Sequence, residues 1–256
     1  MKLTTDGKMT IAAHRGDSYN YYENTMEAFR AAIRSGVEMI ETDVHLTKDD
    51  QLVLIHDNTV ERTTDGRGWI KDMTLAELRK LNAGGSEEWL SIPTLEELLQ
   101  LLKESGTLLN LELKEYYEGD EVSLERCHRC IDLCVELIEK YDMADKMVFN
   151  SFDAHALEYI AETYPGKYLL HGFYPYNKMR NVKRNPDEYL YCACIWGEPR
   201  NREYYEYLAA KGIEAWIGAS ITGAGLLGDC FKLGARLVTT NYPRDCKEKL
   251  EKIGAR

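Results

Sequence analysis

Residues 39–45 read M-I-E-T-D-V-H, an apolar run that holds Glu41 and Asp43 two positions apart. Alternate side chains of a strand point to the same side, so both carboxylates are expected on one face of a strand. A second run, L-N-L-E-L-K, repeats this arrangement with Glu112 and Lys114. Unpaired charge is expensive to bury among apolar residues, which means that these groups need compensation. The two runs therefore predict strands whose charged faces meet at one site.

The rest of the chain alternates strand and helix patterns. Strands are expected at 10–13, 39–45, 107–113, 147–151, 168–172, 191–195, 214–217 and 237–240. Helical patterns lie at 25–35, 122–141, 154–163, 202–211, 226–233 and 244–253. Alternating β and α elements predict a parallel sheet, and eight strands in 256 residues predict a closed (β/α)8 barrel of the TIM-barrel class. The segment between the fifth and sixth of these strands gives the weakest helix pattern.

One long excursion, 46–93, interrupts the alternation after the second strand. It holds a short strand pattern at 51–55 and a turn-rich stretch. One Thr-x-x-Glu capping box begins at Thr74, and a second begins at Thr94, directly after the excursion. Because it follows the second strand, the excursion is expected at the C-terminal mouth of the barrel, where it brings His56. The sequence thus predicts a single domain over all 256 residues, with 46–93 as an inserted lid-like subdomain.

Composition narrows the class of partner. The net charge of -11 and the pI near 5.1 argue against binding to nucleic acid or to an anionic membrane, because either would require a basic surface. A small-molecule substrate is therefore expected, without membrane insertion. The first ten residues lack the apolar run of an export signal, which predicts a cytoplasmic protein. The oligomeric state cannot be predicted from the sequence.

The seven cysteines predict reduced thiols rather than a disulfide framework, since their number is odd and no export signal precedes them. Cys127, Cys130 and Cys134 have a spacing that resembles a metal site. They also lie at i, i+3 and i+7 of a helical pattern, which favours one buried stripe. We interpret them as core residues, because no fourth ligand follows at the spacing of a zinc site.

Five motifs in order carry a family resemblance over nearly the whole chain. They are H-R-G at 14–16, E-N-T at 23–25, E-x-D at 41–43, H-D at 56–57 and E-x-K at 112–114. Together these motifs resemble the glycerophosphodiester phosphodiesterases. The resemblance implies a barrel enzyme that uses a divalent ion to split glycerophosphodiesters into glycerol 3-phosphate and an alcohol.

Residue by residue, the resemblance implies that Glu41, Asp43 and Glu112 are metal ligands and that His14 and His56 are the catalytic pair. All-oxygen ligands suit Mg2+ or Ca2+. Two histidines can transfer protons near neutral pH, and we assign His14 as the base and His56 as the acid. The roles of the two histidines remain exchangeable at this stage, and the nucleophile is either water or the neighbouring glycerol hydroxyl.

Arg15 and Lys114 are expected to bind the substrate phosphate. A structural alternative is that these two cations form salt bridges with the carboxylates, although buried networks of this kind lose much to desolvation. Asn24 has a structural interpretation as the cap of the first helix, with Glu27 closing a capping box.

The chain departs from the family pattern at two strand ends. Where the family reads W-T-V-N, this chain reads W-I-G-A at 216–219, and where the family reads T-D-x-P, it reads T-N-Y-P at 240–243. The family pattern therefore does not define the part of the pocket that contacts the alcohol. Phe152 and Trp216 are the candidate walls of that part. Two other functions stay open: a phospholipase-type enzyme acting on lysophospholipids or phosphoinositides, and a noncatalytic glycerophosphate-binding protein.

Overall fold

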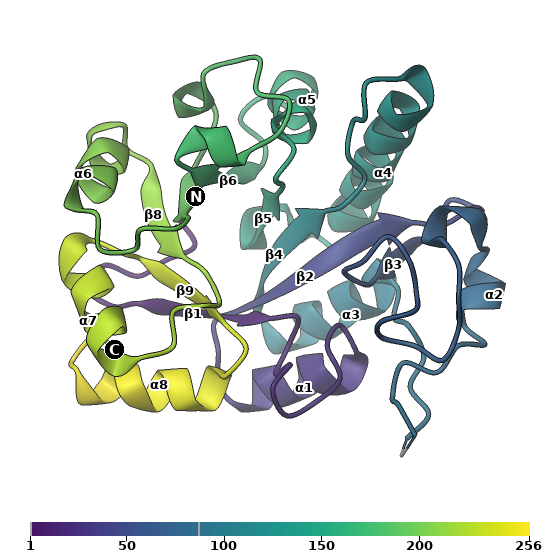
Figure 1. Cartoon of the computed structure of the whole chain (residues 1–256), viewed down its shortest axis with the longest axis horizontal. Coiled ribbons are helices and arrows are strands. Elements are labelled where there is room, and N and C mark those ends of the chain that lie inside the picture. The colour runs from purple at the N-terminus through teal and green to yellow at the C-terminus, as the bar shows by residue number, and fades with distance from the viewer. Residues whose placement is uncertain (1, 87) are drawn as a thin grey trace.

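The computed structural model describes residues 2–86 and 88–256. Eight parallel strands form a closed barrel, since β1 pairs with both β2 and β9, and helices surround it (Figure 1). In barrel order the strands are β1 (Thr10–His14), β2 (Met39–Leu46), β4 (Leu108–Leu113), β5 (Met147–Asn150), β6 (Leu169–Tyr174), β7 (Cys192–Ile195), β8 (Glu214–Ile217) and β9 (Leu237–Thr240). The predicted (β/α)8 barrel is confirmed.

Amphipathic helices follow most of the barrel strands. They are α1 (Met26–Arg34), α3 (Leu95–Ser105), α4 (Glu121–Lys140), α5 (Ala154–Thr163), α6 (Arg202–Ala210), α7 (Ala224–Leu233) and α8 (Pro243–Lys252). The connection from β6 to β7 holds two 3-10 turns instead, η3 (Tyr176–Lys178) and η4 (Pro186–Glu188), where the sequence gives its weakest helix pattern. Within residues 2–86 and 88–256, every helix is too short or too polar to cross a bilayer.

Two apolar clusters pack on opposite sides of the barrel wall. The larger one joins the outer faces of the strands to the helices, and the buried stripe of α4 with its three cysteines belongs to it, as predicted. The smaller one fills the barrel near the start of the strands and contains Leu3, Ala12, Met39, Val148, Cys192, Trp216 and Leu237. Trp216 is fully buried in this inner cluster. It therefore does not form the pocket wall expected of it.

The segment 46–93 stands at the C-terminal end of β2. Its strand β3 (Leu52–Leu54) pairs antiparallel with β2, and its short helix α2 (Leu75–Leu78) begins at the predicted capping box. Figure 1 shows β3 and α2 on the side of the barrel away from α6 and α7. A separate apolar cluster holds the segment together, formed by Val53, Ile55, Val60, Ile70, Leu78, Ala83 and Ile92. That the segment is a lid-like subdomain stays a prediction.

Gly16 turns the chain from β1 toward α1, with φ at +82°. A Cβ at this position would lie 2.6 Å from the backbone carbon of Ala28. We predict that Gly16→Ala lowers the free energy of unfolding by about 3 kcal/mol, because a left-handed backbone and a steric overlap both oppose the methyl group. Denaturant unfolding followed by circular dichroism measures this loss.

Gly106 provides the matched control. It also has a left-handed backbone, with φ at +72°, but a Cβ there would meet nothing within 4 Å. Gly106→Ala should therefore lose only about 1 kcal/mol. Equal losses in the two variants would contradict the close packing of the β1 turn against α1.

Candidate active site

Three carboxylates converge at the C-terminal mouth of the barrel. Glu41 and Asp43 alternate along β2, and Glu112 of β4 lies beside Asp43 in the parallel register. One oxygen from each carboxylate lies within 4.8 Å of the others, and all three side chains are buried. The alternation of side chains along β2 and β4 thus brings these carboxylates together, as expected from the sequence. They form an all-oxygen set, which is the kind that hard divalent cations prefer.

Two fixed cations balance these acids in part. Lys114 Nζ lies 2.5 Å from Glu112 Oε1 and 3.0 Å from Asp43 Oδ1. Arg15 Nε lies 3.2 Å from Asp43 Oδ2. Both cations therefore pair with Asp43, as the salt-bridge alternative predicts. Glu41, by contrast, accepts a hydrogen bond from the backbone N–H of Arg15 and lies 3.9 Å from His14 Nε2.

The pKa shifts show where positive charge is short. Burial raises the pKa of Glu41 well above its usual range, and the charges of Asp43 and Glu112 add to this effect. Burial also raises the pKa of Glu112, although Lys114 opposes the shift. For Asp43, Lys114 and Arg15 outweigh burial and hold the pKa below its ordinary value. Glu41 and Glu112 are therefore only partly compensated, and the donor set fits a divalent cation that would supply the missing positive charge.

Asn24 holds Asp43 in place. Its Nδ2 donates to Asp43 Oδ2 over 2.9 Å, and its Oδ1 accepts from Thr42 Oγ1 over 2.7 Å. The prediction that Asn24 caps the first helix is wrong, because Thr25 is the N-cap and accepts from the N–H of Ala28. Asn24 has a left-handed backbone instead, with φ at 54°. The Asn24 side chain thus holds Asp43 in position and does not cap α1.

His14 ends β1 and is held by the turn after β9. Its Nδ1 lies 2.5 Å from Asn241 Oδ1, which also lies 3.1 Å from Ser18 Oγ. With Asn241 Oδ1 as the acceptor, the ring donates from Nδ1 and Nε2 is left free to take a proton. Burial, followed by the charge of Arg15, lowers the pKa of His14 to about 4. The departure at Asn241 thus fixes the ring without adding a negative charge beside it.

His56 follows β3 and is anchored by its neighbour. Its Nδ1 lies 2.6 Å from Asp57 Oδ1, while Arg62 Nε donates to Asp57 Oδ2 over 2.6 Å. The hydrogen bond from Arg62 lowers the pKa of Asp57 to about 2, so this carboxylate is ionised near neutral pH. The ionised carboxylate accepts from Nδ1 and so orients the His56 ring.

Arg62 also joins the inserted segment to the loop after β1. Its guanidinium donates to both oxygens of Glu23, over 2.9 and 2.8 Å, and Glu23 Oε1 accepts from Arg15 Nη1 over 2.9 Å. A chain of ion pairs therefore runs from His56 and Asp57 through Arg62 and Glu23 to Arg15. The sequence analysis missed Arg62 and Glu23 as site residues. Glu23 stands in the E-N-T motif, while Arg62 lies in a turn-rich stretch that has no periodic signal.

Both histidines line one cavity of about 590 Å3 at the mouth of the barrel. The predicted residues that line it are His14, Arg15, Glu41, His56, Glu112, Lys114 and Phe152. Asp43 lies fully buried beside them. Of the predicted site residues, Trp216 alone lies deeper in the barrel, where its ring centroid is 4.8 Å from that of His171.

Aromatic side chains form one wall of this cavity. Phe152 stacks on Phe173 with ring centroids 3.5 Å apart, and the Trp196 ring meets Phe152 edge-on at 5.4 Å. Trp196 is 48% exposed, so it stands at the rim. The sequence analysis missed Phe173 and Trp196, because an aromatic residue at a strand end has no pattern that separates packing from a pocket wall.

The model of the glycerophosphoryl diester phosphodiesterase family matches residues 14–213 of this chain. A glycerophosphodiester phosphodiesterase of Caldanaerobacter subterraneus subsp. tengcongensis is 39% identical over 165 residues, which are 62% of this chain and 64% of that protein. The corresponding protein of Bacillus altitudinis is 37% identical over 192 residues, which are 70% of each chain. The matched region thus spans less than two thirds of the length of the first relative and slightly more than two thirds of the second.

A solved structure is similar over almost the whole fold. It is an Oleispira antarctica phosphodiesterase in complex with the product sn-glycerol-3-phosphate, with a TM-score of 0.77 and 24% identity. The similarity covers 95% of this chain and 97% of that one. The family match begins at His14 and extends beyond every motif that builds the carboxylate site. The chain therefore belongs to the glycerophosphoryl diester phosphodiesterase family.

Proposed function

We propose that the protein is a metal-dependent phosphodiesterase that hydrolyses glycerophosphodiesters to glycerol 3-phosphate and an alcohol. The observation that carries this proposal is one cavity in which two histidines lie beside converging carboxylates. Membership of the family supports the substrate class. The Oleispira antarctica phosphodiesterase, which was solved with sn-glycerol-3-phosphate as product, supports it further.

Glu41, Asp43 and Glu112 are assigned as ligands of one Mg2+ or Ca2+. When bound, this ion supplies positive charge that offsets the charge building on the phosphate oxygens. Arg15 and Lys114 add fixed cationic groups that bind the phosphate. Their side chains are 16% and 8% exposed and already held by acids, so little further ordering is needed when the substrate binds.

His14 and His56 are assigned opposite proton transfers. His14 takes a proton from the nucleophile at Nε2, because Asn241 keeps the other ring nitrogen protonated. His56 gives a proton to the departing alkoxide as the bond from phosphorus to the alcohol oxygen breaks, and Asp57 orients its ring. The nucleophile is water or the neighbouring glycerol hydroxyl. The second route forms a cyclic phosphate, and its opening by water reverses both proton transfers.

The first prediction concerns turnover. Purified protein should release glycerol 3-phosphate from a panel of glycerophosphodiesters, lose this activity in a chelator and regain it with Mg2+ or Ca2+. His14→Ala and His56→Ala should each lower kcat by about 100- to 10,000-fold, the range of general acid–base catalysis. His128→Ala should leave kcat unchanged, because this partly exposed histidine lies on α4 outside the lining of the cavity.

Each alternative has its own outcome in this assay. Activity that survives chelation would remove the metal from the proposal. Binding of a glycerophosphodiester without turnover would favour the noncatalytic alternative, and cleavage of lysophospholipids alone would favour the phospholipase. A transient cyclic phosphate, followed by phosphorus NMR, would identify the glycerol hydroxyl as the nucleophile.

The second prediction tests the metal site without turnover. At about 100 times Kd, bound Mg2+ or Ca2+ should stabilise the protein by about 2.7 kcal/mol and raise Tm by about 5 °C. Glu41→Gln removes one ligand with little change of shape and should abolish most of this rise in a thermal scan. Glu61→Gln, at an exposed acid of the inserted segment, should keep it. An equal rise in both variants would place the cation elsewhere.

The third prediction tests the chain of ion pairs. Arg62→Met should lower kcat by about 10- to 100-fold with a smaller change in KM, because misplacing the acid His56 affects the chemical step most. Arg62→Lys should recover part of this loss. Arg67→Met, at an exposed arginine of the same segment, is the control and should change neither constant. A loss in KM alone would mean that Arg62 acts on binding instead.

A further inference from the structure

His56 lies just beyond the paired part of the inserted strand. β3 pairs with β2 as far as Leu54, and Ile55 still donates to the backbone oxygen of Asp43 over 3.2 Å. His56 follows these contacts. Asp57 orients its ring, but the ring can meet a substrate correctly only if the backbone that carries it is also held in place.

His45 provides a contact to that backbone. It is buried on β2 and follows Asp43 by two residues. Its Nε2 lies 3.3 Å from the backbone oxygen of His56, and because a backbone carbonyl can only accept a hydrogen bond, Nε2 is the donor. The backbone of His56 is therefore tied to the strand that carries two of the three proposed metal ligands.

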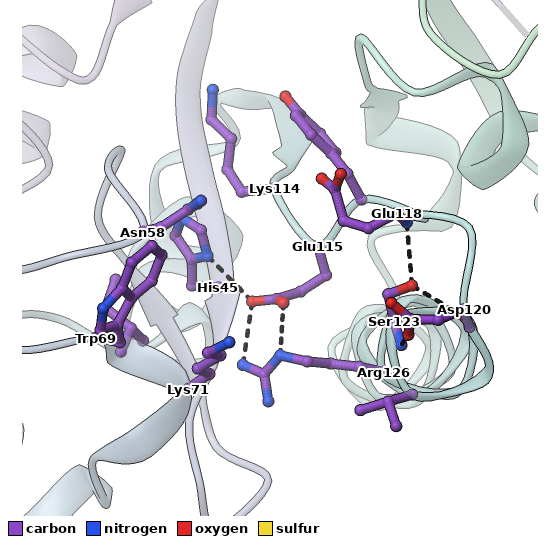
Figure 2. Close-up of a pocket in the computed structure, with 13 residues that line it drawn as sticks. His45, Asn58, Trp69, Lys71, Lys114, Glu115, Glu118, Asp120, Ser123 and Arg126 are labelled. Carbon is purple, nitrogen blue, oxygen red and sulfur yellow. Dashed lines mark hydrogen bonds and ion pairs between the residues drawn. The ribbon is translucent and has the colours of Figure 1, made fainter.

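Glu115, in the loop after β4, holds the other ring nitrogen of His45. Its Oε1 lies 3.0 Å from His45 Nδ1 and accepts from the backbone N–H of Leu46 over 3.0 Å. Arg126 of α4 donates from Nε to Glu115 Oε2 over 2.6 Å, and from Nη2 to the backbone oxygen of Leu46. Figure 2 shows Glu115 between His45 and Arg126. The His45 ring thus has a partner at each of its nitrogens.

These three side chains form a group that is already satisfied within the protein. The side chain of His45 is 3% exposed and that of Glu115 is 13% exposed. Burial raises the pKa of Glu115, but His45 and Arg126 outweigh burial and bring the pKa to about 2. In the part of the chain that the structure describes, none of the three lines the catalytic cavity. Any effect on the reaction must therefore pass through another residue.

We propose that His45 is a positioning residue for His56, the proposed acid. With Glu115 and Arg126 behind it, His45 keeps the backbone of His56 at a fixed place relative to the carboxylates. The proposal rests on the proposed phosphodiesterase function and on the assignment of His56 as the acid. A displacement of about 1 Å can lower the rate of the chemical step by about 100-fold, while substrate binding changes less.

Two substitutions at His45 separate its two contacts. Glutamine can place an amide N–H near the position of Nε2, whereas the shorter asparagine places it near Nδ1. His45→Asn should therefore lose the contact to His56 and lower kcat by about 10- to 100-fold, with a smaller change in KM. His45→Gln should keep that contact and a kcat within about three-fold of wild type. Equal losses in the two variants would contradict the proposal.

The leaving group gives a second readout, which a purely structural role would not move. The assay compares the methyl and para-nitrophenyl esters of glycerol 3-phosphate. Methoxide needs a proton to depart, whereas nitrophenolate is a stable anion and needs none. His45→Asn should therefore lower kcat for the methyl ester and leave kcat for the nitrophenyl ester nearly unchanged. An equal loss for both esters would show that His45 does not act through the acid.

The carboxylate site provides an internal control. His45→Asn keeps Glu41, Asp43 and Glu112, so Mg2+ or Ca2+ should raise its Tm as much as in wild type. A lost rise would mean that His45 acts through Asp43, its neighbour on β2, and would overturn its role at His56.

Arg126→Met tests the same group from α4, at a partly exposed position where folding is less at risk. It should lower kcat for the methyl ester by about three- to ten-fold and spare the nitrophenyl ester. Arg129→Met, at an exposed arginine of the same helix, is the matched control and should change neither. If His45→Asn does not fold, this pair decides: an unchanged methyl ester in Arg126→Met would refute the proposal.

Failure of the inference is distinct from failure of the proposed function. A wild-type protein that hydrolyses both esters, with variants that lose both equally, would remove the role of His45 alone. A wild-type protein that hydrolyses neither ester would remove the phosphodiesterase function and, with it, this inference.

Discussion

The structure depends on the burial of three carboxylates at the mouth of a parallel barrel. Glu41, Asp43 and Glu112 stand on adjacent strands because a period of two and the parallel register place them there. Removing such charges from water is unfavourable by several kcal/mol each unless partners replace the lost hydration. Lys114 and Arg15 replace it for Asp43, whereas Glu41 and Glu112 remain short of positive charge. This shortage is the reason for proposing a cation at the site.

The balance of buried charge also explains how the inserted segment is held against the barrel. The segment has its own small apolar cluster, and its short strand β3 pairs with the end of β2. What orients His56 over the barrel is polar: Asp57 holds the ring, Arg62 holds Asp57, and Glu23 holds Arg62. The chain ends at Arg15, which also contacts Asp43. His56 and the carboxylate site are therefore parts of one network of charges.

The sequence predicted those features that follow a local period. All eight barrel strands and the carboxylate cluster were predicted because alternation in a strand is a short-range pattern. The role of Asn24 was not, because an asparagine before a helix fits a cap as well as a contact to Asp43, and only the tertiary structure decides between them. Arg62 and Glu23 meet across a long stretch of chain without any shared period.

Trp216 illustrates a different limit. Alternation shows that a side chain points into the barrel, but not how deep it lies. The register pairs Trp216 with Leu237, the first residue of β9, so the indole lies near the floor rather than at the mouth. Depth in a closed barrel depends on the stagger between strands, which is a property of the whole sheet.

The catalytic cavity combines side chains from the barrel strands with one from the inserted segment. The carboxylates must hold fixed positions, and they lie on β2 and β4, whose central pairing fixes them. The inserted segment supplies His56 to the catalytic cavity. The segment inserted after β2 lies beside the carboxylates and yet carries none of the proposed metal ligands, so its sequence can change without altering the carboxylate cluster.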